Sequence, residues 1–191
     1  MKLLFTLLSF LYLTPSTVKT TVQKSAPLAD VANTFQDEKF PTLPDNISRL
    51  FYVQRSPNIN TIVYELNADK NGKLNTEEPI HVYWIRYGEK GQKEELSYIQ
   101  RKFAYGLTTK ALPNDQYDIR FVSYKKFPLT LMKGNDGKYH IFATVNQKPM
   151  YISRIFLKIE GGSFWLPNVK YVEIKGIETS TGKEIVERFK P

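Results

Sequence analysis

The sequence contains no cysteine in its 191 residues. This absence excludes disulfide bonds, thiolate ligands for metal ions and a cysteine nucleophile. A domain that works outside the cytoplasm without disulfides depends on its hydrophobic core. With 41% hydrophobic residues, a chain of this length can build such a core, and we expect one globular domain.

A hydrophobic run long enough to cross a bilayer, which takes about 20 residues, is also missing. The clearest apolar run covers residues 3–13, follows Lys2 and precedes small residues, which is the layout of a secretory signal peptide. We therefore expect residues 1–16 to be a signal peptide, 17–45 a flexible linker and 46–191 a single β-rich domain. The mature chain would be periplasmic or extracellular, with no transmembrane segment.

Long runs of one charge sign are absent, although the formal net charge is +8. The longest basic stretches are the pairs Arg101-Lys102 and Lys125-Lys126, so the chain has no basic arm of the kind that follows a nucleic-acid backbone. Export also argues against nucleic acid as a partner. A basic surface suits an anionic glycan, a lipid headgroup or an acidic protein, or is only solvated.

Short segments rich in Tyr, Ile, Val and Phe, separated by turn residues, make up most of the chain after residue 45. These residue types favour β-strands. Nine segments qualify as strands: 49–55, 60–66, 80–88, 117–124, 128–132, 138–145, 150–160, 169–177 and 184–189. We predict a mainly β fold, an antiparallel sandwich or barrel of about eight or nine strands with one packed α-helix. A parallel α/β arrangement is the alternative, which a single helix disfavours.

The helix is predicted over residues 93–106, where Leu96, Ile99 and Phe103 follow helical spacing. Acidic residues stand in its first turn and basic residues in its last, as the helix dipole favours. The three apolar side chains should pack against the sheet. The predicted core as a whole consists of Phe51, Val53, Ile62, Tyr64, Trp84, Ile119, Phe121, Ile141, Ile155 and Val172.

The block from "RLFYVQRSPNINTIVYELN" through "PIHVYWIRYG" to "LSYIQRKFAYG" resembles an uncharacterised family of exported bacterial proteins, a domain of unknown function. The resemblance runs from about residue 45 to the C-terminus. It implies a single exported domain and no assigned activity, so it transfers no functional residue to this sequence.

Residues 67–78, "NADKNGKLNTEE", match the spacing of an EF-hand calcium loop. Strand-like segments flank the loop in place of helices, and only Asp69 and Glu78 supply ligand charge, while Lys70 and Lys73 partly cancel it. We expect a polar connection with a tight turn and no bound metal or other cofactor; calcium binding is the alternative.

No sequence motif of a known catalytic site occurs. The two histidines, His81 and His140, lie in predicted strands with no informative spacing. Carboxylates for glycoside hydrolysis would have to come from Glu65, Asp115, Asp118 or Glu173, and the sequence does not bring any two of them together.

Arginines inside apolar strands are the stronger indication of a site. Such arginines beside aromatic side chains can line a pocket for an anionic or sugar-like ligand, or can lie on solvent-facing positions. The four arginines of this kind are Arg55, Arg86, Arg120 and Arg154. We select Arg86, Arg120, Tyr83 and Trp84, together with the loop residue Trp165, as candidate ligand-binding residues; a structural role for Trp165 at the open end of the fold is the alternative.

Two functions remain from these observations. The first is a non-catalytic binding or interaction module of the bacterial cell envelope, which fits export, a basic β-rich domain and the lack of motifs. The second is a hydrolase that acts on envelope glycan or lipid. A pocket that holds a histidine and a carboxylate, or two carboxylates, would favour the hydrolase.

Overall fold

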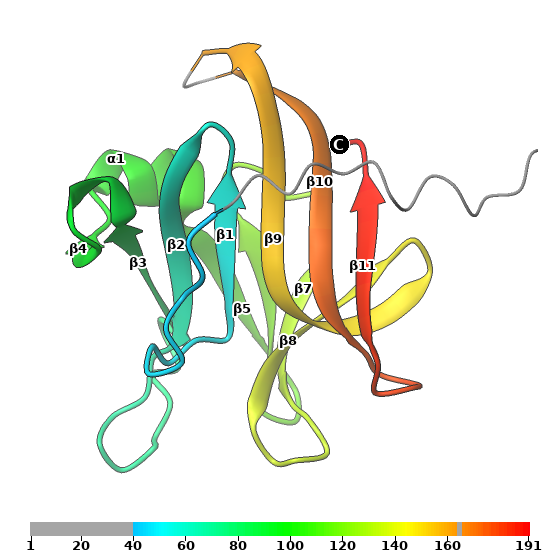
Figure 1. Ribbon diagram of the computed structural model, residues 1–191. Helices are drawn as coiled ribbons and strands as arrows, with labels where there is room; N and C mark the ends of the chain where they lie inside the picture. Colours follow the sequence, from blue (N-terminus) through cyan, green and yellow to red (C-terminus); the bar gives the residue numbers. More distant parts are fainter. Residues whose placement is uncertain (1–39, 164–165) are drawn as a thin grey trace, which may run out of the picture. The chain divides into compact units, whose positions relative to one another are not determined.

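The predicted strands assemble into one curled sheet in the computed structural model, which describes residues 40–163 and 166–191 (Figure 1). Trp165 therefore lies outside the described residues. The strands are β1 Phe51–Arg55, β2 Asn58–Leu66, β3 Ile80–Arg86, β4 Gln92–Glu95, β5 Leu107–Leu112, β6 Gln116–Phe121, β7 Leu129–Lys133, β8 Tyr139–Val145, β9 Lys148–Gly162, β10 Pro167–Glu178 and β11 Glu184–Phe189.

The strand order is β4-β3-β2-β1-β9-β8-β7-β6-β5, and β10 and β11 follow on the other edge of β9. Strand β9 is 15 residues long, and one of its edges pairs with β8 from Lys148 to Tyr151 and with β1 from Arg154 to Leu157. The sheet thus divides along β9, and its two halves curl toward each other. Strands β4 and β5 stay unpaired at their outer edges within the described residues, so the result is an open half-barrel.

The prediction of a mainly β fold with mostly antiparallel pairing and one short helix is confirmed. Residues 40–163 and 166–191 form neither a closed barrel nor a two-sheet sandwich. The pairing of β1 with β9 is parallel, which the sequence did not predict.

The core lies between the two curled halves. Nine of the ten predicted core residues belong to the main buried cluster, and Phe121 is partly buried against it. The Phe51 and Tyr64 rings stack with centroids 4.3 Å apart, and Phe121 meets both edge-on at 6.2 and 5.8 Å. Phe121 comes from β6 and the other two from β1 and β2, so this trio joins the two halves.

A second, smaller cluster covers the outer face of the sheet. Leu43 is buried there with Val63, Tyr83 and Ile85. The backbone carbonyl of Pro41 accepts a hydrogen bond of 3.0 Å from the Gln54 amide. The last residues of the predicted linker therefore pack on the sheet.

The helix predicted over residues 93–106 begins later than expected. Residues 92–95 form the edge strand β4, the α-helical turn α1 covers Tyr98–Gln100, and a π-helical turn, η3, covers Arg101–Tyr105. Ser97 caps α1, because its side chain accepts a bond from the Gln100 N–H while the Gln100 side chain accepts one from the Ser97 N–H. A short 3₁₀ turn, η2, covers Tyr87–Glu89.

The packing face predicted for this helix is also wrong in part. Leu96 is buried, but Ile99 and Phe103 are each 50% exposed. The segment contacts the sheet through Gln100, which accepts a bond of 3.3 Å from the Trp84 indole, and through Tyr105, whose ring meets Trp84 edge-on at 5.0 Å. The π-helical turn follows a different spacing from an α-helix, so side chains chosen by α-helical spacing do not share one face.

Strand β8 alternates between a buried and a more exposed face. Ile141, Ala143 and Val145 are buried, while Phe142 is half-buried and Thr144 exposed on the other face. In the turn before this strand, Gly137 has a positive φ of 73° that glycine adopts without strain. Over the described ranges, no helix is long and apolar enough to span a membrane.

Candidate functional site

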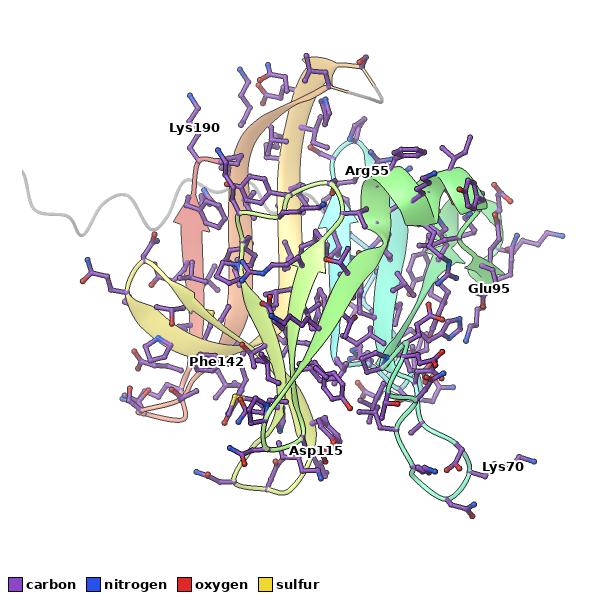
Figure 2. All side chains as sticks on the ribbon, turned by 180° about the vertical axis from the view of Figure 1, so that it is seen from behind. Arg55, Lys70, Glu95, Asp115, Phe142 and Lys190 are labelled. Atoms are coloured by element: carbon purple, nitrogen blue, oxygen red, sulfur yellow. The ribbon has the colours of Figure 1, made fainter. Side chains whose placement is uncertain are left out.

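A pocket of about 230 Å³ opens at one end of the half-barrel, which we call the pocket end. Strands β1 and β11 finish there, and the chain after β6 and the turn η3 close the sides (Figures 1 and 2). Its walls are mainly apolar and aromatic, and include Val53, Tyr64, Tyr105, Phe121, Phe127 and Phe189. The open ends of barrels and largely apolar concavities of this kind are common positions for small-molecule sites.

Strand alternation places one basic side chain in this pocket. Phe51 and Val53 are buried on the inner face of β1, and Arg55 is the next residue of the same face. The β1–β2 register shifts between Val53 and Arg55, at the point where β1 reaches the pocket end. Arg55 is the only charged side chain among the described lining residues.

The Arg55 guanidinium has an unusual environment. It lies over the ring of Tyr105, 5.5 Å from the centroid. No carboxylate in the described part of the chain pairs with it, and its Nε is buried without a hydrogen-bond partner. Buried polar groups normally have a partner, so this nitrogen requires an explanation.

Two tyrosines of the wall, Tyr64 and Tyr105, are held in the neutral form. Burial raises the pKa of Tyr64, and its hydroxyl donates a hydrogen bond of 2.9 Å to the Tyr105 carbonyl. Burial also raises the pKa of Tyr105, against the opposing charges of Arg55 and Arg86. Arg55 therefore meets neutral aromatic surface and no phenolate.

Two of the candidates from the sequence lie behind this wall. Trp84 is buried and packs against Tyr105, and the Arg86 guanidinium lies 4.8 Å from the centroid of the Trp84 ring. Arg86 also donates two hydrogen bonds of 2.8 Å to the Glu94 carboxylate, which lower the pKa of Glu94. Trp84 supports Tyr105, and neither Trp84 nor Arg86 lines the pocket.

The other two described candidates lie apart from it. Tyr83 belongs to the outer cluster, where the Lys93 ammonium is 3.6 Å from its ring centroid. Arg120 donates to its neighbour Asp118 at 2.9 Å and to the Lys125 carbonyl at 3.3 Å. The structure does not bring the sequence-selected residues together in one site, and their contact with a ligand stays a prediction.

The loop that matches the EF-hand spacing projects from the opposite end, where Figure 2 labels Lys70. Asp69 uses Oδ1 to accept bonds from the N–H groups of Asn71 and Lys73, at 2.8 and 2.9 Å. Glu78 pairs with Arg101 at 2.7 Å. No group of three or more His, Cys, Asp or Glu residues that could hold a metal ion occurs in the described ranges.

Each histidine has a carboxylate partner away from the pocket. His81 lies 2.9 Å from Glu95, and His140 lies 3.0 Å from Asp136. None of these four residues lines the pocket. The sequence identified Arg55 as one of four strand arginines, but the absence of a partner, which sets it apart, becomes visible only in three dimensions.

Comparison with protein families finds one match, over residues 51–188, to the family described as Domain of unknown function (DUF4833). The match covers most of the half-barrel. Comparison with curated proteins and with solved structures finds no match to this chain.

Proposed function

We propose that this chain, which belongs to the family described as Domain of unknown function (DUF4833), is an exported, non-catalytic binding protein of the bacterial cell envelope. Its ligand is a small amphipathic anion, with a carboxylate or phosphate at Arg55 and an apolar body against the aromatic walls of the pocket.

The observation that carries this proposal is the unpaired Arg55 in an apolar pocket. A buried donor without a partner costs about 1–3 kcal/mol, and an arginine without a counter-ion in apolar surroundings contributes little to stability. A carboxylate or phosphate would supply both the counter-charge and bidentate hydrogen bonds to the guanidinium. A short alkyl or aromatic body would fill the rest of the pocket.

The carboxylates considered for a hydrolase support binding over hydrolysis, because each has a partner elsewhere. Asp115 bonds to Lys133 and Tyr139 at the far end of the molecule (Figure 2). Glu65 pairs with Lys93, Asp118 with Arg120, and Glu173 with two arginines of the outer face. The described lining of the pocket contains no histidine or acidic residue that could act as a general base.

Titration calorimetry with octanoate, decanoate and dodecanoate tests the proposal, with decanol as the uncharged probe. We expect saturable binding of at least one carboxylate, and an affinity for it that falls by at least about tenfold in Arg55→Gln, since hydrogen bonds to charged groups contribute about 1.5–3 kcal/mol.

Arg154→Gln is the matched control, because it removes the same charge from the neighbouring strand β9. Arg154 bonds to Gln54 and Glu173 and does not line the pocket. Its affinity should stay within about twofold of the wild type, with a melting curve recorded for both variants. Absence of binding by all three carboxylates, or equal losses in the two variants, would contradict the proposal.

Export has its own test. Mass spectrometry of the protein from its native host should find a mature N-terminus between Ser16 and Ala26, where the apolar run has ended and small residues follow. Recovery of the chain with Met1 intact from the soluble fraction would contradict export.

A further inference from the structure

Exposed hydrophobic side chains gather at the pocket end. The described residues include nine large hydrophobic side chains that are exposed, and six of them come from segments at this end: Ile59, Tyr98, Ile99, Phe103, Tyr124 and Leu166. Leu166 is 80% exposed and Tyr98 71%. Tyr124 lines the pocket, Leu166 precedes a lining residue, and Ile59 follows the β1–β2 turn next to Arg55, which Figure 2 labels.

Positive charge gathers at the same end. The segments 55–59, 98–105, 121–128, 157–170 and 189–191 carry one acidic residue, Glu160, and eight basic residues: Arg55, Arg101, Lys102, Lys125, Lys126, Lys158, Lys170 and Lys190. Elsewhere in the described part of the chain, basic and acidic residues are equal in number, fifteen of each. The net charge of the half-barrel is therefore located around the mouth of the pocket.

Four of these lysines have no carboxylate partner in the described part of the chain. Lys102, Lys125, Lys126 and Lys190 are exposed, and none pairs with a carboxylate within the ranges described. The Lys102 ammonium lies 5.3 Å from the ring centroid of Tyr98 and 5.4 Å from that of Phe103. Lys190 is labelled in Figure 2 beside the pocket end.

We propose that the pocket end docks onto the surface of an anionic lipid bilayer. Tyr98, Ile99, Phe103 and Leu166 would enter the headgroup and upper acyl region, and the lysines would meet lipid phosphates. Aromatic and aliphatic side chains next to lysines are the composition of membrane-surface segments, and each Lys or Arg near an anionic surface contributes about 1 kcal/mol.

A bilayer fits this surface better than an acidic protein does. The exposed apolar side chains of the described residues come from four separate segments around an opening, whereas the centre of a protein interface is a contiguous apolar patch. A bilayer accommodates separate inserted side chains and lysines that reach past them to the phosphates.

The turn η3 connects docking with the pocket. Ala104 and Tyr105 line the pocket, while Phe103 and Tyr98 are exposed on the same short helical segment. A docked molecule would have its pocket mouth at the lipid surface, where amphipathic anions partition. The idea that docking brings the pocket to amphipathic anions in the lipid rests on the proposed function. The docking proposal itself rests on the exposed side chains and charges.

Sedimentation with lipid vesicles tests the proposal on the full chain. One set of vesicles contains phosphatidylcholine alone, and the other contains equal parts of phosphatidylglycerol and phosphatidylcholine. Residues 1–39 are the same in every variant. A difference in partition between variants therefore comes from the half-barrel. We expect partition onto the anionic vesicles to exceed partition onto the neutral ones and to fall as salt rises.

Two pairs of variants locate the contact. Lys125→Glu with Lys126→Glu should lower partition by at least about thirtyfold, from two lost contacts of about 1 kcal/mol each. The double variant Lys70→Glu, Lys73→Glu makes the same change in net charge in the loop at the opposite end. It should lower partition onto the anionic vesicles by less than about threefold. Tyr98→Ser with Leu166→Ser should lower partition more than Ile177→Ser with Val186→Ser, which alters exposed residues of β10 and β11.

Equal losses in the pocket-end and control pairs, or no preference for anionic vesicles, would overturn the proposal. Binding to soluble polyglutamate at least as tight as to anionic vesicles would also overturn it, in favour of an acidic protein partner. The Arg55→Gln variant separates the two proposals, because it should lose decanoate binding and keep partition within about fivefold. Vesicle binding without decanoate binding would refute only the ligand, and the converse would refute only the docking.

Discussion

The guanidinium of Arg55 lies over the ring of Tyr105, with 5.5 Å between Cζ and the ring centroid. No hydrogen bond or ion pair joins the Arg55 side chain to another described residue, and its Nε stays buried and unpaired. Tyr105 in turn rests on Trp84. The arginine is thus held by an aromatic wall and lacks the anion that its guanidinium would bind.

Replacement of Arg55 by methionine should not weaken the fold. Arg55→Met removes a buried donor without a partner but also loses a cation–π contact of about 0.5–2 kcal/mol. We expect the free energy of unfolding to stay unchanged or to rise by up to about 1 kcal/mol, as measured by urea denaturation without added ligand. A loss above about 2 kcal/mol would show that Arg55 has a structural role.

Trp84 is expected to matter for stability. It is the largest fully buried side chain among the described residues, so Trp84→Ala should lower the free energy of unfolding by about 3–5 kcal/mol. Tyr98→Ala, at an exposed aromatic residue of α1, should change it by less than about 0.5 kcal/mol. If Trp84→Ala were as mild as the control, the assignment of Trp84 to the core would be wrong.

Tyr83 should make stability depend on pH in the alkaline range. Burial, with the neighbouring carboxylate of Glu65, raises the pKa of Tyr83 from 10.0 to about 12. Since the folded state holds this proton more tightly than the unfolded chain, the contribution is complete below pH 10 and is lost as the pH rises toward about 12.

The measurement compares urea unfolding of the wild type and Tyr83→Phe across that interval. The wild type should lose stability more steeply than Tyr83→Phe, because phenylalanine has no proton to lose; the other tyrosines contribute equally to both. Parallel curves would contradict the pKa shift of Tyr83.

The loop at residues 67–78 should not respond to calcium. Asp69 accepts bonds from the backbone of its own turn and Glu78 pairs with Arg101, so both carboxylates are occupied. Millimolar calcium should leave the melting temperature unchanged. A saturable rise that disappears in Asp69→Ala would reverse this prediction, because a ligand of the folded state raises apparent stability.

Much of the β architecture could be predicted because it depends on local pattern. The alternation of Ile141, Ala143 and Val145 defines the buried face of β8 regardless of its neighbours. The parallel pairing of β1 with β9 joins Tyr52 to Arg154, and no local pattern reports a contact between residues so far apart.

The helix begins later than predicted because tertiary contacts of residues 94–95 outweigh their local helix propensity. Glu94 and Glu95 suit a first helical turn, but in the fold they pair across β3 and β4, Glu94 with Arg86 and Glu95 with His81. The helix begins only after Ser97, whose cap stabilises the later start.

The sequence could predict the type of residue at the site, an arginine in an apolar strand, but not which of the arginines it is. Four strand arginines look alike in the sequence, and the structure separates them by their partners. Arg86 pairs with Glu94, Arg120 with Asp118 and Arg154 with Glu173. These pairs depend on strand register and packing, and only Arg55 is left facing a pocket without a carboxylate.

The most direct test of the ligand site is a crystal structure of the protein with decanoate. The account predicts a carboxylate oxygen within hydrogen-bond distance of the Arg55 guanidinium, at about 2.7–2.9 Å, and an alkyl chain between Tyr105 and Phe127. Decanoate bound elsewhere, or in the pocket with its carboxylate turned away from Arg55, would contradict it.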